Sequence, residues 1–173
     1  MKHYICPFTR CGMNFSNNVS QMNLNLDEYT YPDNFNSALK LIEEAISGER
    51  EDELFYDYLI KNAPENESKK IISGIRDNEK KHNKMFRFIY YELAGNMIPS
   101  PENVEFNIPN SFCNGIKRAL NGELNAVIKY RKILFALNNR KHINMLIEII
   151  TDELRHASLY NFIYTSNCSK EQF

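Results

Sequence analysis

The 173-residue sequence lacks tryptophan and lacks an excess of either charge, since 21 Lys and Arg residues face 22 Asp and Glu residues. The basic residues are scattered, so the sequence has no basic patch of the kind that binds nucleic acid. No apolar stretch is long enough to span a bilayer, and the first ten residues lack the apolar run of a signal peptide. We therefore expect a soluble cytoplasmic protein with no nucleic-acid or membrane partner.

Cysteine is also scarce. Four cysteines in a chain of this length do not indicate a disulfide scaffold, so we expect reduced thiols. His3, Cys6 and Cys11, with the distant Cys168, form a weak candidate for a metal site. The Cys-x-x-x-x-Cys spacing does not match a common zinc knuckle. Cys113 is expected to pack as a small apolar residue.

Apolar residues recur at helical spacing in four segments. They predict helices over about residues 35–62, 65–93, 111–137 and 141–164. The segment 96–110 contains three prolines and no helical period, which favours a long crossover over a tight turn. The sequence thus predicts an all-α fold, a four-helix bundle of two helical hairpins joined by a long crossover. The expected parts are an irregular segment 1–33, the bundle 34–165 and a tail 166–173.

Two Glu-x-x-His motifs stand in matched halves of the chain. Each motif follows a lone Glu, and the lone Glu and the Glu of the motif are 30 residues apart in both halves. Residues three apart share a helix face, so each motif directs a carboxylate and an imidazole to one point. Four carboxylates and two imidazoles from four helices form the ligand set of a di-iron or di-manganese centre. The predicted ligands are Glu49, Glu79, His82, Glu123, Glu153 and His156.

The two halves form an internal repeat with a shift of 74 residues. A Gly precedes each lone Glu (Gly48 and Gly122), and a Tyr follows it by seven residues (Tyr56 and Tyr130). All four Glu residues of the predicted site fall on the apolar stripes of their helices. Four buried carboxylates would be very costly unless cations offset their charge. The pattern therefore predicts two divalent ions inside the bundle rather than acids on a solvated face.

Five further residues bear on the limits of this site. Glu53 lies one turn beyond the first lone Glu and is expected to pair with a basic residue, with a seventh ligand as the alternative. Glu51 and Asp52 are expected to be solvated, and Asp152 to face away from the centre. His142, near the start of the last helix, is expected at the surface.

The paired motifs, the Gly-Glu steps and the two tyrosines resemble the rubrerythrin branch of the ferritin-like superfamily over residues 35–164. The resemblance implies a ferritin-like four-helix bundle that binds two iron ions through the six predicted ligands. Manganese suits the same ligands. It also implies that Tyr56 and Tyr130 lie near the centre as hydrogen-bond partners, with plain core packing as the alternative. A homodimer is expected from the same resemblance.

Two departures from that family bear on activity. The sequence has no Cys-x-x-Cys pairs for a rubredoxin-like module, so electrons would come from another protein. Leu120 stands where rubrerythrins usually have a further Glu that is tied to the peroxidase cycle. The leading hypothesis is an oxidoreductase whose reduced di-metal centre gives electrons to peroxide or dioxygen. The alternatives are a ferritin-like iron-handling protein, a manganese catalase-like enzyme, and a structural protein whose metal site holds the bundle together.

Overall fold

The computed structural model describes residues 29, 34–99 and 106–168, with the side chain of Glu49 excepted. These residues contain helices and no strand. The helices are α1 (Phe35–Ser47), α2 (Glu49–Asn62), α3 (Asn66–Ala94), α4 (Phe112–Phe135) and α5 (Arg140–Asn167). The prediction of an all-α bundle is therefore confirmed. The expectations for His3, Cys6 and Cys11, and for nearly all of the irregular N-terminal segment, lie outside the described residues.

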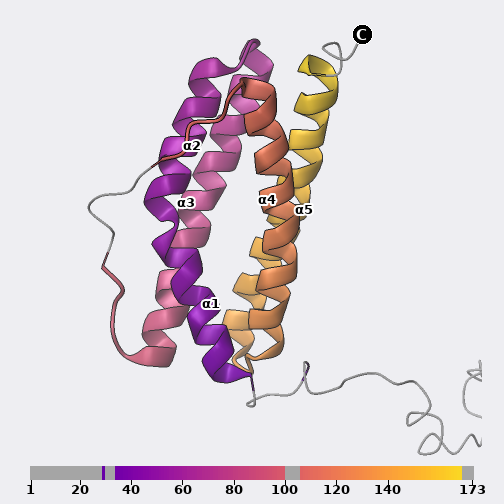
Figure 1. Ribbon diagram of the computed structural model, residues 1–173. Helices are drawn as coiled ribbons and strands as arrows, with labels where there is room; N and C mark the ends of the chain where they lie inside the picture. Colours follow the sequence, from indigo (N-terminus) through magenta and orange to yellow (C-terminus); the bar gives the residue numbers. More distant parts are fainter. Residues whose placement is uncertain (1–28, 30–33, 100–105, 169–173) are drawn as a thin grey trace, which may run out of the picture.

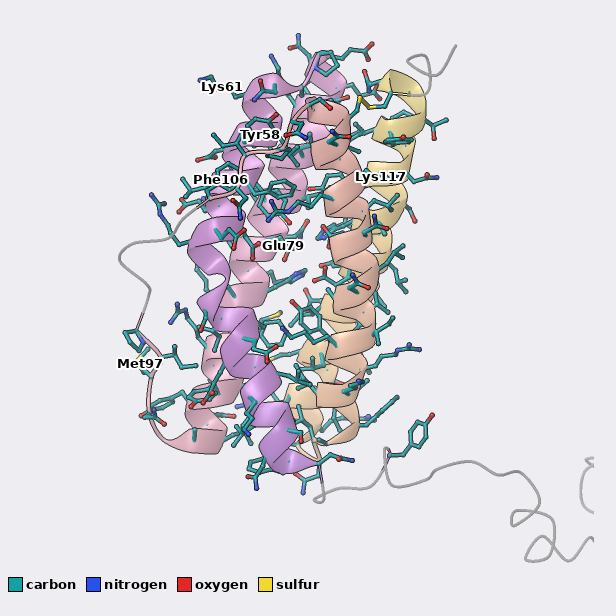
Figure 2. All side chains as sticks on the ribbon, in the orientation of Figure 1. Tyr58, Lys61, Glu79, Met97, Phe106 and Lys117 are labelled. Atoms are coloured by element: carbon teal, nitrogen blue, oxygen red, sulfur yellow. A yellow bond between two sulfur atoms is a disulfide. The ribbon has the colours of Figure 1, made fainter. Side chains whose placement is uncertain are left out.

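The helices form two antiparallel hairpins that pack side by side (Figure 1). α1 and α2 together ascend one side of the bundle and α3 descends beside them, while α4 and α5 form the second hairpin. The described end of the crossover is tied to the bundle. The Tyr58 hydroxyl donates a hydrogen bond to the Pro109 carbonyl at 3.1 Å, and the Tyr58 ring packs on Phe106 (Figure 2). The predicted topology of two hairpins is confirmed.

The first predicted helix is interrupted, so the expectation of one continuous helix over residues 35–62 was wrong. α1 ends at Ser47 and α2 begins at Glu49, with Gly48 between them. Glycine weakens a helix by about 1 kcal/mol relative to alanine. A new helix start also places Glu51, Asp52 and Glu53 close to an N-terminus, where the helix dipole stabilises negative charge. The break lies directly before the first predicted ligand.

Two apolar clusters fill the bundle, and a polar layer separates them. One cluster fills the end of the bundle that contains α1. It includes Ile42, Ile46, Phe86, Ile89, Ile133, Leu146 and Ile149. The other includes Phe55, Tyr56, Leu59, Ile72, Ile75, Ile116, Tyr160 and Ile163. The motif residues of α3, α4 and α5 fall between the two clusters in the sequence of each helix. The fold thus places them in the middle of the bundle.

A disulfide joins Cys113, in the first turn of α4, to Cys168, which caps the end of α5. The expectations of reduced thiols, of Cys113 as a packing residue and of Cys168 as a distant metal ligand were wrong here. The reason is topological. Because α4 and α5 are antiparallel neighbours, the start of one meets the end of the other, and the two Cα atoms lie 5.6 Å apart. That distance suits a disulfide.

His142 is also buried rather than at the surface, with 2% of the side chain exposed. The first turn of α5 packs against the end of α3, where His142 Nε2 lies 2.6 Å from Glu92 Oε2. The sequence did not show this contact because it joins residues from different helices. Within the described ranges, no helix is long and apolar enough to cross a membrane.

Candidate metal centre

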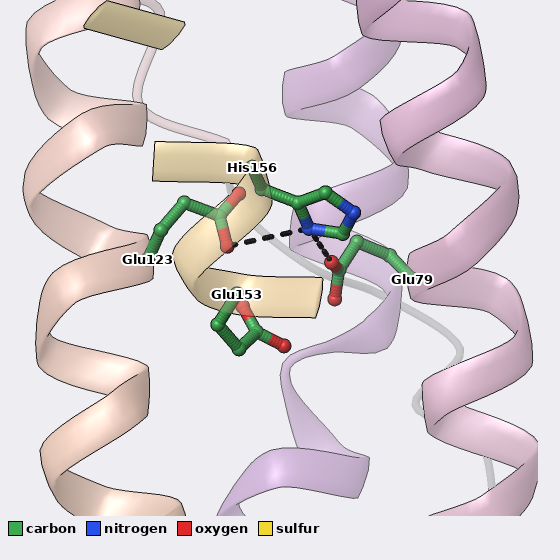
Figure 3. A group of neighbouring side chains, drawn as sticks. All are labelled: Glu79, Glu123, Glu153 and His156. Carbon is green, nitrogen blue, oxygen red and sulfur yellow. Dashed lines mark ion pairs between the residues drawn. The ribbon is translucent and has the colours of Figure 1, made fainter. Parts of the chain in front are cut away.

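Four of the predicted ligands converge in the polar layer. Glu79 of α3, Glu123 of α4, and Glu153 and His156 of α5 each place one ligand atom within 4.8 Å of the others (Figure 3). Glu123, Glu153 and His156 are 6%, 2% and 0% exposed. Figure 2 shows Glu79 about halfway along the bundle. Three buried or nearly buried carboxylates thus share one small volume with an imidazole.

His82 completes the described part of the cluster. Its Nδ1 lies 3.4 Å from Glu79 Oε1 and 3.3 Å from Glu153 Oε1. His156 Nδ1 lies 2.9 Å from Glu79 Oε1 and 3.7 Å from Glu123 Oε2. The two imidazole rings stack with their centroids 5.8 Å apart. Both histidines therefore present Nδ1 to the carboxylates.

Four of the inward atoms take part in these ion pairs but make no hydrogen bond of good geometry to the described residues. They are Glu79 Oε1, His82 Nδ1, Glu153 Oε1 and His156 Nδ1. Buried polar atoms in proteins are nearly always hydrogen-bonded, so four that are not, in one cluster, need an explanation. Carboxylate oxygens and imidazole nitrogens are the donor atoms that iron and manganese bind. The arrangement fits a di-metal carboxylate group, whose ions would use these atoms.

The Asp152 carboxylate lies on the outer side of His82, although the sequence pattern did not predict it as part of the site. Asp152 faces away from the centre, as expected, but its Oδ2 lies 3.1 Å from His82 Nε2. Arg155 donates a hydrogen bond to Asp152 Oδ1 at 3.0 Å. Partial burial raises the pKa of Asp152, but the bonds from His82 and Arg155 outweigh it and lower the pKa. A carboxylate bonded to Nε2 leaves Nδ1 of His82 available for a metal.

The pKa values show how the cluster balances its charge without a metal. Burial raises the pKa of Glu153 to about 9 and that of Glu123 to about 8. Burial opposes the charged form of His82, but the adjacent carboxylates of Glu153 and Glu79 raise its pKa to about 10. Burial also raises the pKa of Glu79, yet the two adjacent histidines lower it overall. Protons thus occupy the site at neutral pH, and a cation must displace them.

The acidic start of α2 has a mixed outcome. The side chain of Glu49 is outside the described structure, so its ligand role stays a prediction. Glu53 forms an ion pair with Arg50, which confirms the expected pairing with a basic residue. Asp52 is exposed as a whole residue, as expected, but its side chain lines a pocket with Glu79 and His82, where neighbouring groups shield the carboxylate from water. Burial of its carboxylate and the charge of Glu79 raise the pKa of Asp52 to about 7.

That pocket leads to the carboxylate cluster from the side of α2 and α3. Its volume is about 210 Å³. The basic residues Arg76, Lys80 and Lys84 line it together with Asp52 and Glu53. Its aromatic lining consists of Tyr56, Phe86 and Tyr130. The pocket therefore combines charged groups with apolar walls beside two predicted ligands.

Tyr56 and Tyr130 line the same pocket as Glu79 and His82. Burial raises the pKa of each well above its ordinary value, and nearby carboxylates add to the shift. For Tyr130 the strongest charged neighbour is Glu153. Their proximity to the cluster is clear, while their role as hydrogen-bond partners of ligands stays a prediction.

Comparison with known proteins gives one finding about this architecture. The family model described as Rubrerythrin matches residues 40–164. This span covers all the predicted ligands and both tyrosines. No curated protein and no solved structure matches the chain significantly.

Proposed function

The chain belongs to the rubrerythrin family, and on that premise we propose that it is a di-iron oxidoreductase that reduces peroxide or dioxygen. The observation that carries this proposal is the set of buried atoms on Glu79, Glu153, His82 and His156 that meet one another in ion pairs without a hydrogen bond of good geometry. A structural bundle would gain stability by pairing such atoms or replacing them. Their retention favours a metal-binding role. Manganese remains an alternative occupant, because the same donor atoms suit it.

The residues of the chain would divide the work as follows. Glu79, Glu123, Glu153, His82 and His156, with Glu49 as predicted, would hold the ions. Bound iron would supply the electrons that reduce the oxidant. Tyr56 and Tyr130 carry phenolic protons beside the carboxylates, where they are available to a reduced oxygen atom. The apolar clusters on both sides of the layer limit water, while the pocket admits a molecule as small as peroxide.

The proposal includes partners. Electrons spent on the oxidant must be replaced, and the sequence has no rubredoxin-like module, so we infer a separate electron-donor protein in the cytoplasm. We also infer a homodimer, from family resemblance.

One observation favours a second candidate. Leu120 packs against the apolar cluster that contains Tyr160, so no carboxylate stands at the position that rubrerythrins use in the peroxidase cycle. This supports a ferritin-like protein that binds iron without turnover, or a manganese catalase-like enzyme. The catalase differs from the peroxidase in needing no reductant.

Measurements of metal content and of peroxide or dioxygen turnover test these hypotheses together. The protein is purified from cells supplied with iron and manganese, beside the Glu79→Ala/Glu153→Ala double variant. We expect about two ions per chain, lost in the variant, and peroxide consumption that requires an added reductant. Oxygen release without reductant would favour the catalase. Bound iron with no peroxide or dioxygen consumption would favour iron handling. Absence of metal after anaerobic reconstitution with ferrous iron would overturn the metal centre itself.

A further inference from the structure

The two halves of the metal centre differ in one phenol. A shift of 74 residues relates Tyr56 to Tyr130 and Phe86 to Tyr160. In one half, Tyr130 packs against Phe86 with ring centroids 4.8 Å apart. In the other half, Tyr56 and Tyr160 lie in one apolar cluster, and each affects the pKa of the other. The repeat therefore carries a second phenol in one half only.

The hydroxyl of Tyr160 is buried without a hydrogen bond. The residue is 0% exposed, and its Oη has no partner among the described residues. The phenol of Tyr56 lies beside it, but the two groups do not make a hydrogen bond of good geometry. A buried tyrosine hydroxyl normally finds a partner. We therefore expect the hydroxyl to find its hydrogen-bond partner in the metal-bound protein.

Packing indicates which group that partner is. Tyr160 belongs to the same apolar cluster as Ile116 and Ala119 of α4, and Glu123 follows Ala119 by one helical turn on the same face of that helix. In agreement with this placement, Glu123 is the first carboxylate, after burial, among the causes that raise the pKa of Tyr160. A carboxylate has two oxygens with several lone pairs, so one oxygen can bind an ion while the other accepts a hydrogen bond. In the equivalent position of the other half, Phe86 has no hydroxyl to donate.

We propose that Tyr160 is a positioning residue that donates its phenolic hydrogen bond to the Glu123 carboxylate when metal is bound. The proposal rests on the proposed function only in requiring a metal at this site. A bonded ligand is held in one orientation, and such outer partners commonly change metal affinity. The two metal positions are therefore inequivalent, and the ion bound by Glu123 depends on Tyr160.

The test compares metal affinity with metal-free stability in Tyr160→Phe. Mn²⁺ is titrated into the metal-free, full-length protein by calorimetry, and thermal unfolding is followed with and without Mn²⁺. We expect affinity at one of two positions to fall about tenfold, the scale of a lost hydrogen bond to a charged group. The Tm of the metal-free variant should equal or exceed that of the wild type, because the lost hydroxyl had no partner.

Tyr90→Phe is the matched control. The Tyr90 hydroxyl donates a hydrogen bond to Glu43 Oε1 at 2.5 Å, away from the centre. This variant should lower the metal-free Tm and leave both Mn²⁺ affinities unchanged. If Tyr160→Phe behaves like this control, Tyr160 is only structural and the proposal is wrong.

The mirror variant Phe86→Tyr gives a second test should Tyr160→Phe not fold. It places a phenol in the other half and should raise the affinity for the second ion; unchanged affinity would overturn the proposal. Wild-type protein that binds no Mn²⁺ would overturn it together with the metal centre. Two bound ions without oxidant turnover would overturn the proposed activity alone.

Discussion

The two hairpins carry the proposed ligands in the same pattern but differ in the residues around them. In the second hairpin, Gly122 lies inside an unbroken α4 and a disulfide closes the far end. In the first, Gly48 separates two helices. The four residues after the lone Glu are charged in the first half (Arg50, Glu51, Asp52, Glu53) and uncharged in the second (Leu124, Asn125, Ala126, Val127). The two halves thus share the pattern of proposed ligands, while the charged residues after the lone Glu and the pocket beside the site belong to the first hairpin.

The largest expected effect comes from removing the disulfide of the second hairpin. Cys113→Ser/Cys168→Ser should lower the free energy of unfolding by about 2–4 kcal/mol, because the unfolded chain regains the freedom that the cross-link removes. Urea unfolding of the metal-free protein measures it. The wild type under a dithiol reductant should match the double variant, whereas the variant itself should not respond to the reductant. Equal stability with and without the disulfide would mean that helix packing alone closes this hairpin.

The pH dependence of the metal-free protein is the next largest expected effect, and the carboxylates of the two hairpins contribute to it differently. Glu123 and Glu153 of the second hairpin have pKa values raised to about 8 and 9, whereas the pKa of Glu79 in the first is lowered. A raised pKa means that the folded state binds more protons than the unfolded state, so stability falls as pH rises. The Tm should decline between about pH 5 and pH 9. His82, with a pKa of about 10, acts in the same direction.

Substitution identifies the source of that decline. Glu153→Gln should reduce the decline without abolishing it, because the variant has no proton to lose there while Glu123, His82 and Asp52 still titrate. Glu79→Gln should leave the alkaline decline in place, since Glu79 is already ionised. Thermal unfolding over this pH range in metal-free buffer measures both. A Tm that rises toward pH 9 in the wild type would contradict the assigned pKa directions.

A smaller effect is expected from substituting the residues that contact the outer sides of the two histidines. Asp152 contacts His82 Nε2, while its repeat equivalent, Asn78, accepts a hydrogen bond from Arg155. Asp152→Asn should weaken metal binding by about 10- to 100-fold, as losses of such outer partners do. Asn78→Asp is the control, with little expected effect. Metal titration measures both variants, and equal losses would show that the two histidines are supported alike.

The smallest effect is expected at the matched glycines. Gly122→Ala should stabilise the protein by about 1 kcal/mol, because alanine is the better helix former and the added Cβ meets no atom within 4 Å. Gly48→Ala should gain less, since its Cβ would lie 3.4 Å from Asp52 Oδ2 and the helix ends there. Chemical denaturation measures the difference. A larger gain at Gly48 would show that the break persists only because of the glycine.

The fold could be predicted from the sequence because apolar residues recur at helical spacing over long segments. The four helical segments and the crossover followed from apolar spacing, and the family match confirms that level. The two Glu-x-x-His motifs likewise marked Glu79, His82, Glu153 and His156, which the structure brings together. Local spacing suffices when the partners of a motif lie on one helix face.

The remaining features depend on contacts between helices. The bond between Cys113 and Cys168 spans 55 residues and exists because two helix ends meet. The burial of His142 and the contact of Asp152 with His82 are likewise between helices. Tyr160 could have been suspected from its place in the repeat opposite Phe86, but its missing hydrogen bond is visible only in three dimensions.

The disulfide has a consequence for assembly of the metal centre. The bond from Cys113 to Cys168 closes a covalent ring that contains Glu123, Glu153 and His156. Within this ring, three donor groups stay at high effective concentration even when the helices have melted. The oxidised unfolded chain should then keep some affinity for the ions, and binding to the unfolded state reduces the stability that metal confers. In the proposed centre, the cross-link therefore reduces the stability that the metal adds to the folded state. In return, it keeps three of the proposed ligands close together in the unfolded chain, which favours refolding around the ions.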